Sequence, residues 1–114
     1  MQRTTVILAL LAVVVAAFAA PALAGTARST AATVAGNPAN GKKIFATAGC
    51  AGCHTLKAAK ATGKVGPNLD KLKPAYAKVV TQVTKGGGTM PAFKGRLTTS
   101  QIQDVAAFVY TSTH

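Results

Sequence analysis

The sequence predicts an all-α domain of three to five helices. Apolar side chains recur with the period of a helix in two stretches, residues 76–83 and 102–109. Glycine and proline separate these stretches from the rest of the chain. No stretch shows the two-residue alternation of a half-buried strand, and no internal repeat is present. Neither a sheet nor a repeat architecture is therefore expected.

The first part of the domain is predicted to hold one regular helix followed by irregular structure. Asn37 is a favourable N-cap and Pro38 suits the first helical position, so a helix should begin here and end near Gly49. Residues 50–56 are expected to form a turn. Residues 57–73 contain five lysines, two glycines and a proline, which predicts an irregular loop.

Two further helices are predicted in the second part of the domain. One has Pro74 in its first turn and ends at Gly86–Gly88, where glycine permits a sharp change of direction. The last begins at Thr98, and Gln101 three residues later completes the pattern of a capping box. Each of these two helices is predicted to bury one apolar face. The buried face of the helix after Pro74 consists of Tyr76, Val79, Val80 and Val83. The buried face of the last helix consists of Ile102, Val105, Ala106 and Val109, with Phe108 alongside.

The first and last helices are predicted to cross. Gly41 has no side chain and would let Phe108 approach closely, with Phe45 packing one turn further along. The alternative is that Gly41 is only a weak helix former, which costs about 1 kcal/mol relative to alanine.

The N-terminus has the pattern of a Sec-type signal peptide: Arg3, an apolar run over residues 6–20, and an Ala-x-Ala cleavage site. The run is short for a membrane span, which needs about 20 residues. We expect a signal peptide over 1–24, a flexible linker over 25–37 and one domain over 38–114, located in the periplasm or an equivalent extracytoplasmic compartment. A retained N-terminal membrane anchor is the alternative.

The charge balance is strongly positive. Thirteen lysine and arginine residues against two acidic residues give a formal net charge of +11. Such a chain is attracted to acidic surfaces, at rates that fall as salt rises. Partner proteins with acidic docking surfaces are therefore expected, association with a membrane surface stays open, and a charge that serves only solubility is the alternative. Nucleic acid is not expected as a partner, because the chain is expected to be exported and shows no basic-aromatic surface for reading bases.

The most specific chemical pattern is the run Cys50-Ala51-Gly52-Cys53-His54. Two thiols three residues apart on a helical turn can each add to a vinyl group of one porphyrin. His54 lies about 40° around the helix from Cys50 and so faces the same porphyrin. The Cys-x-x-Cys-His pattern is the attachment site of haem c. It predicts one haem, covalently bound through Cys50 and Cys53, with His54 as an iron ligand.

Three other uses of the two cysteines fit the chain less well. A thioredoxin-like redox pair needs a βαβ setting, which this sequence does not offer. A closed zinc site needs further ligands, and the only other histidine is His114. A disulfide would leave His54 without a role.

Met90 is the predicted sixth ligand of the iron. Met1 leaves with the signal peptide, so Met90 is the only methionine of the mature chain. It lies in a loop between Gly86–Gly88 and Pro91, whereas a methionine that only fills a core would be expected within a helix. Methionine sulfur as an axial ligand raises the reduction potential of haem. His114 and the lysines remain alternative ligands.

The order of five short motifs resembles class I monohaem cytochrome c, in particular the short bacterial and photosynthetic-type carriers. The motifs are Gly41-x-x-x-Phe45, Cys50-x-x-Cys53-His54, Gly66-Pro67-Asn68-Leu69, Met90-Pro91-Ala92-Phe93 and the segment Leu97–Phe108. The resemblance extends over about residues 38–113. It implies the small cytochrome c fold, with the helices wrapped around the haem and His54 and Met90 as axial ligands. It also implies that the carbonyl of Pro67 accepts a hydrogen bond from His54.

These predictions together describe an electron carrier with no catalytic residues. It would be a monomer that shuttles single electrons between periplasmic or membrane redox partners. Lys42, Lys43, Lys57 and Lys94 are the candidate docking contacts near the haem edge. A membrane-anchored or complex-bound haem subunit of a larger oxidoreductase is the alternative. An enzyme with an open sixth iron position, acting on peroxide or a small gas, is the second alternative.

Overall fold

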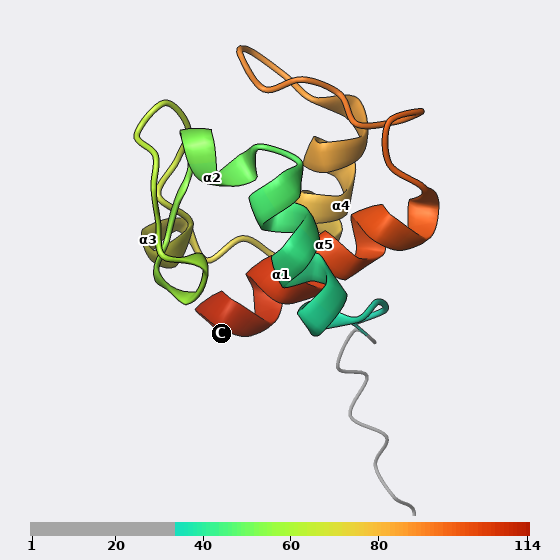
Figure 1. Ribbon diagram of the computed structural model, residues 1–114, viewed down its shortest axis with the longest axis horizontal. Coiled ribbons are helices and arrows are strands. Elements are labelled where there is room, and N and C mark those ends of the chain that lie inside the picture. Colours follow the sequence, from blue (N-terminus) through green and yellow to red (C-terminus); the bar gives the residue numbers. More distant parts are fainter. Residues whose placement is uncertain (1–33) are drawn as a thin grey trace, which may run out of the picture.

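The computed structural model describes residues 34–114, and this part of the chain is built mainly from helices (Figure 1). The α-helices are α1 (Pro38–Thr47), α2 (Cys50–Cys53), α3 (Leu69–Leu72), α4 (Tyr76–Lys85) and α5 (Thr99–Thr113). A 3-10 helix, η1 (Lys57–Ala59), and two short strands, β1 (Thr55–Leu56) and β2 (Ala61–Thr62), lie between α2 and α3. The all-α prediction is confirmed.

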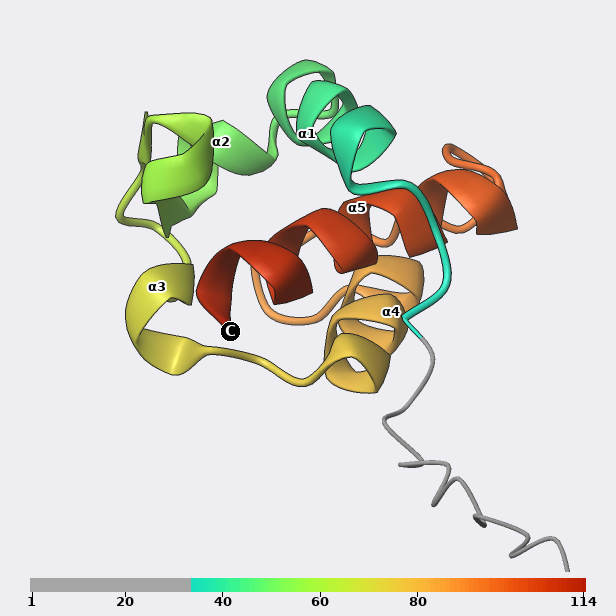
Figure 2. The ribbon, with the colours of Figure 1, turned by 90° about the horizontal axis from the view of Figure 1, so that it is seen from below.

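Helix α5 is the centre of the domain. It lies between α1 on one side and α4 on the other (Figure 2), and these two helices make its most extensive contacts. The predicted inner face of α5 is confirmed, because each of its residues is buried: Ile102, Val105, Ala106, Phe108 and Val109. On α4, Val79 and Val83 are buried, whereas Tyr76 and Val80 are half-buried at the edge of the core.

The predicted crossing of α1 and α5 is also confirmed. A Cβ atom built on Gly41 would overlap the carbonyl oxygen of Asp104 and lie 2.7 Å from Cβ of Phe108. The rings of Phe45 and Phe108 meet edge to face, with centroids 5.7 Å apart. The two helices can approach this closely only because position 41 lacks a side chain.

Replacing Gly41 by alanine should therefore destabilise the domain, although alanine is the better helix former. The added methyl group must push α1 away from α5, which we expect to cost at least about 2 kcal/mol, or roughly 10 °C in Tm. Thermal unfolding followed by circular dichroism measures this loss. Gly52→Ala is the matched control, because a Cβ there meets nothing within 4 Å. Equal melting temperatures for both variants would contradict the crossing geometry.

Both long-range and local hydrogen bonds determine where the helices begin. The side chain of Asn37 accepts hydrogen bonds from the N–H groups of Ala39 and Asn40, at 2.9 and 3.3 Å. The backbone N–H of Asn37 itself donates to Oδ1 of Asp104 at 2.7 Å, which ties the start of α1 to α5. Residues 34–37, the end of the predicted linker, thus pack on the domain; the rest of that linker and the predicted signal peptide lie outside the described residues. The predicted capping box at Thr98 is present.

Three details of the predicted secondary structure were wrong. Strands β1 and β2 form a two-stranded antiparallel sheet, which pairs Thr55 with Thr62 and is too short to produce an alternating pattern. The expected irregular loop contains η1 and α3, and α3 begins where Asn68 Oδ1 accepts the N–H of Lys71 at 3.2 Å. Helix α4 begins at Tyr76 after the N-cap Ala75, because Pro74 is buried and lines a cavity instead of joining the helix.

Candidate haem site

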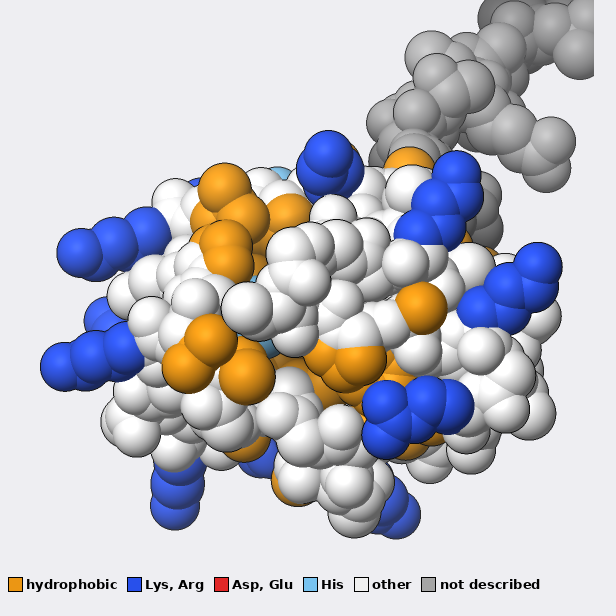
Figure 3. Space-filling view, turned by 90° about the horizontal axis from the view of Figure 1, so that it is seen from above, with side chains coloured by type: hydrophobic (Ala, Val, Ile, Leu, Met, Phe, Trp, Pro, Cys, Tyr) orange, Lys and Arg blue, Asp and Glu red, His pale blue; other side chains and the backbone are white. Residues whose placement is uncertain are grey.

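A cavity of about 570 Å³ lies at the centre of the domain, and all five described α-helices contribute to its wall. The five predicted site residues line this one cavity: Cys50, Cys53, His54, Pro67 and Met90. Helix α2 and the loop that carries Met90 lie at the top of Figure 1, and the view from above shows hydrophobic side chains around a hollow on this face (Figure 3). Lysine and arginine side chains lie around its periphery, and no acidic side chain is visible there.

A sharp turn after α1 brings the two cysteines to the cavity. Gly49 adopts a left-handed conformation (φ 88°), which ends α1 and starts the single turn of α2. The N–H of His54 donates to the carbonyl of Cys50 at 3.0 Å and closes this turn. The thiols of Cys50 and Cys53 are both free. Burial raises the pKa of the Cys50 thiol, which therefore stays protonated near neutral pH before it reacts.

The imidazole of His54 is held in one orientation by the segment that follows β2. Nδ1 lies 2.8 Å from the carbonyl oxygen of Pro67, so that Nδ1–H donates and Nε2 keeps its free electron pair. A Cβ on Gly66 would lie 2.6 Å from Cε1 of the ring, and the N–H of Gly66 donates to the Cys53 carbonyl at 2.7 Å. The ring therefore rests directly on the backbone of Gly66. This arrangement leaves Nε2 as the nitrogen available to a metal.

The segment that follows β2 also packs against α2, through the backbone around Gly63. Thr55 Oγ1 donates to the carbonyl of Gly63 at 2.8 Å. A Cβ on Gly63 would come within 2.6 Å of the Cys53 backbone. Two glycines, at positions 63 and 66, thus allow the loop to lie against the Cys-x-x-Cys-His turn.

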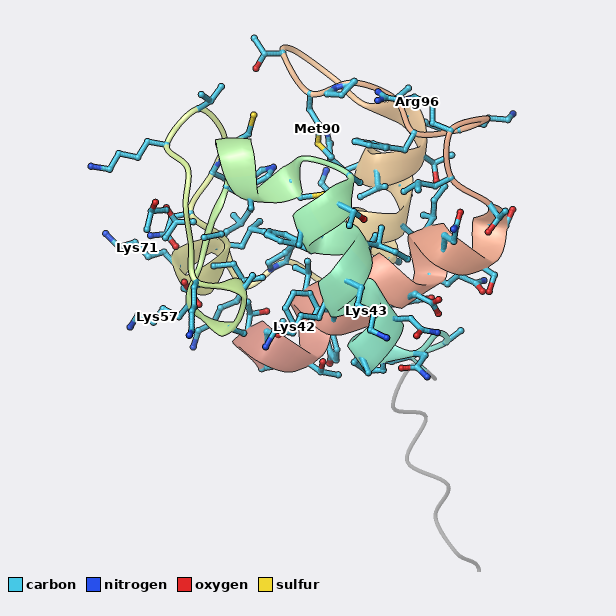
Figure 4. The ribbon with its side chains drawn as sticks, viewed as in Figure 1. Lys42, Lys43, Lys57, Lys71, Met90 and Arg96 are labelled. Carbon is cyan, nitrogen blue, oxygen red and sulfur yellow. The ribbon has the colours of Figure 1, made fainter. Side chains whose placement is uncertain are left out.

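The loop that carries Met90 is anchored at both ends. Gly86 ends α4 with φ 66°, and a Cβ there would lie 2.7 Å from the carbonyl oxygen of Met90. Gly87 and Met90 exchange two backbone hydrogen bonds of 3.0 Å, and the N–H of Phe93 donates to the Val83 carbonyl at 2.9 Å. Figure 4 shows Met90 on the upper loop with its sulfur turned toward the body of the domain. A short, doubly anchored loop thus presents the sulfur to the cavity.

Sequence reasoning missed several residues of the cavity wall. Among residues 34–114, Val65 and Leu72 are the large apolar side chains most exposed to solvent, at 68% and 57%, and both line the cavity. Large apolar side chains within a lysine-rich segment were the feature of the sequence that could have indicated a binding site here. Lys78 lines the cavity, whereas the candidate docking contacts Lys42, Lys43, Lys57 and Lys94 do not.

The alternative metal arrangements receive no support from the described residues. No group of three or more His, Cys, Asp or Glu side chains in residues 34–114 could share a metal ion, as a zinc site requires. His114 does not line the cavity. Its ring stacks on Tyr110 at 4.2 Å, and its Nδ1 lies 3.1 Å from the Tyr110 carbonyl.

The family model described as "Cytochrome C oxidase, cbb3-type, subunit III" matches residues 36–109. Cytochrome c6 of Nostoc sp. (strain PCC 7120) is 41% identical over 99 residues, which cover 82% of this chain and 77% of the relative. Cytochrome c6 of Microcystis aeruginosa is 45% identical over 76 residues, 61% of this chain and 90% of the relative.

Two solved structures are similar to the described domain. The c-type cytochrome SorU from Sinorhizobium meliloti aligns with a TM-score of 0.63 and 48% identity, over 67% of this chain and 90% of that chain. Cytochrome c6 from the diatom Phaeodactylum tricornutum aligns with a TM-score of 0.57 and 34% identity, over 68% of this chain and 95% of that chain.

The cavity fits the covalent haem that these similarities imply. Its volume of about 570 Å³ lies within the range of ligand sites. Its wall is largely apolar, as a porphyrin requires, and it carries two free thiols on one turn beside an oriented imidazole. Met90 supplies a sulfur to the same cavity from a separate loop.

Proposed function

The chain belongs to the class I monohaem cytochrome c family, and from this premise we propose that it is a diffusible one-electron carrier whose axial ligands are His54 and Met90. As a member of this family it carries haem c, covalently bound, and serves in electron transfer. The observation that supports the ligand pair is that both side chains line one cavity together with Cys50 and Cys53.

An electron carrier must change its charge state with little structural rearrangement, and several residues of the chain serve this requirement. Haem c, when bound, supplies an iron that alternates between the ferrous and ferric states. Pro67 and Gly66 hold the His54 imidazole in one orientation, and the anchored loop holds Met90. Apolar side chains such as Val79 and Val105 keep water from the cavity wall. Rigid ligands and a dry interior limit rearrangement between two charge states, which favours rapid transfer.

The sequence supports a proposal for the cellular compartment and for the redox partners of the protein. A Sec-type signal peptide over residues 1–24 would export the chain to the periplasm or its equivalent. The net charge of +11 favours redox partners with acidic surfaces around the approach to the cavity. Within residues 34–114 no helix is both long and apolar enough to cross a bilayer.

A haem subunit of a larger oxidoreductase is the second candidate, because the matching family model is described as a subunit of an oxidase. In its membrane-anchored form, this candidate retains the N-terminal segment as an anchor. The mass of the exported protein distinguishes the two, since a carrier that is released lacks residues 1–24.

A redox titration followed by absorption tests the proposed carrier function. We expect a single one-electron transition, a low-spin ferric spectrum and a weak sulfur-to-iron charge-transfer band. Added cyanide or nitric oxide should leave the ferric spectrum unchanged at low concentration, because both axial positions are filled by the protein. A high-spin spectrum that responds to these ligands would instead support an enzyme with an open iron position.

A further inference from the structure

The wall of the central cavity carries a single lysine. Among the residues that line the cavity, Lys78 is the only lysine or arginine, and no aspartate or glutamate is present. Lys78 is exposed to solvent, so it lies at the rim, where the cavity wall meets the surface of the domain. The other lysine and arginine side chains of residues 34–114 lie outside this wall. The domain thus places one cation at the edge of a largely apolar site.

No acidic side chain of the chain meets Lys78 at the cavity. The chain has only two acidic side chains, Asp70 and Asp104, and neither lines the cavity. Asp70 is half-buried and Asp104 is buried, and each accepts a backbone hydrogen bond, at 2.9 and 2.7 Å respectively. Both carboxylates therefore serve the fold. A carboxylate that meets Lys78 at the cavity must belong to a group other than the side chains of this chain.

Lys78 also occupies an unfavourable position in its own helix. It lies in the first turn of α4, where the partial positive charge of the helix N-terminus disfavours a cation. This turn contains no acidic residue, and the N-cap Ala75 makes no side-chain hydrogen bond to it. Lys85, by contrast, lies in the last turn of α4, where a positive charge is favourable. The charge of Lys78 therefore does not serve α4, which points to a use at the cavity.

The haem that the family places in this cavity brings two carboxylates with it. Its thioether bonds form at the vinyl groups, and its two propionates leave the porphyrin from the edge away from these bonds. Cys50 and Cys53, which form the thioethers, are on α2, whereas Lys78 is on α4. Helices α2 and α4 lie on different sides of the domain in both views (Figures 1 and 2). Lys78 is thus the one cation of the wall that a propionate can meet.

From this arrangement we infer that the ammonium group of Lys78 pairs with a haem propionate and thereby raises the reduction potential of the iron. The inference rests on the proposed carrier function and assigns to one residue a share in its driving force. Reduction adds an electron to the haem, so a negative propionate opposes it and a cation that compensates the propionate favours it. Because Lys78 is exposed, water and salt weaken this effect. Lys78 acts through the propionate and does not coordinate the iron.

The test is a redox titration of the exported, haem-loaded protein against hexacyanoferrate at low salt. Lys78→Gln should shift the equilibrium about fivefold toward the ferric protein, which lowers the potential by roughly 40 mV at about 59 mV per tenfold. Lys85→Gln is the matched control, because it removes the same charge from the same helix outside the cavity wall, and it should shift the equilibrium less than twofold. Lys78→Arg keeps the charge and should keep the potential of the parent. Equal shifts in the two glutamine variants would overturn the inference.

Infrared difference spectra between the oxidised and reduced protein provide a second measurement, which detects the carboxylates directly. Lys78→Gln should shift the propionate carboxylate band, whereas Lys85→Gln should leave it in place. An unchanged band in Lys78→Gln would overturn the pairing. So would slower reaction of this variant with an acidic redox protein at an unchanged potential, because Lys78 would then serve docking. None of these outcomes would affect the low-spin spectrum and the sulfur-to-iron band, which test the carrier function separately.

Discussion

Replacing both Cys50 and Cys53 by serine should leave the domain without a cooperative fold. The cavity that they border has a volume of about 570 Å³, and seven residues of the hydrophobic core form part of its wall: Phe45, Leu69, Val79, Val83, Phe93, Val105 and Val109. A closed void of this volume would be destabilising by about 14 kcal/mol at roughly 24 cal/mol per Å³, and because this cavity opens to solvent the figure is an upper limit. That upper estimate is as large as the whole stability of a small domain.

The measurements are far-UV circular dichroism and extraction with acidic organic solvent, after export from a host that attaches haem. The parent should keep its colour through extraction, while the double variant should lose any haem it contains and show the spectrum of an unfolded chain. The single variants Cys50→Ser and Cys53→Ser are the controls, since each retains one covalent bond and should remain folded with a lower Tm. A double variant that melts cooperatively at the temperature of the parent, without haem, would show that the core does not depend on the porphyrin.

The parts of the fold that could be predicted are those whose causes lie within a few residues in sequence. Helix α5 combines a capping box at Thr98 with an apolar stripe about two turns long, so both its start and its buried face were visible in the sequence. The crossing at Gly41 was also accessible, because a glycine one turn before Phe45 in the same helix indicates a face on which another helix can approach closely. These features need only the geometry of one helix.

The parts that escaped prediction depend on contacts between distant segments. Strands β1 and β2 have two residues each, which is shorter than any detectable alternation. Helix α3 is a single turn, and the hydrogen bond from Lys57 to Asp70 that joins it to η1 spans 13 positions. Local propensity does not carry this information, so a lysine-rich segment with glycines and a proline was interpreted as irregular.

The candidate site likewise has features that could be predicted from the sequence and features that depend on contacts between distant segments. Residue type and spacing predict what Cys50, Cys53, His54 and Met90 can bind, and the structure brings these four residues to one cavity. Their surroundings could not be predicted. Gly66 was noticed only as part of a motif, and its contact with the imidazole of His54 depends on how the following loop folds back. The positions of the lysines relative to the cavity likewise needed the structure, since charge alone does not indicate a face.

Replacing Met90 by leucine should change the electronic state of the iron more than it changes the fold. Leucine has nearly the volume of methionine, so packing in the cavity is largely preserved while the sulfur is lost. Met90 is the only methionine of residues 34–114, so no other sulfur of this type can take its place. We expect a high-spin ferric spectrum, loss of the sulfur-to-iron charge-transfer band, and a fall in reduction potential by a sizeable fraction of the roughly 0.8 V range that axial ligands control.

Thr89→Ala is the matched control, because Thr89 lines the same cavity in the same loop but offers no sulfur. It should keep the low-spin spectrum and shift the potential little, which separates disturbance of the loop from loss of the ligand. Cyanide should bind the ferric Met90→Leu protein readily and the control poorly, since only the former lacks a protein ligand on that side. A low-spin spectrum in Met90→Leu with the potential of the parent would indicate that one of the exposed lysines, and not Met90, completes the coordination of the iron.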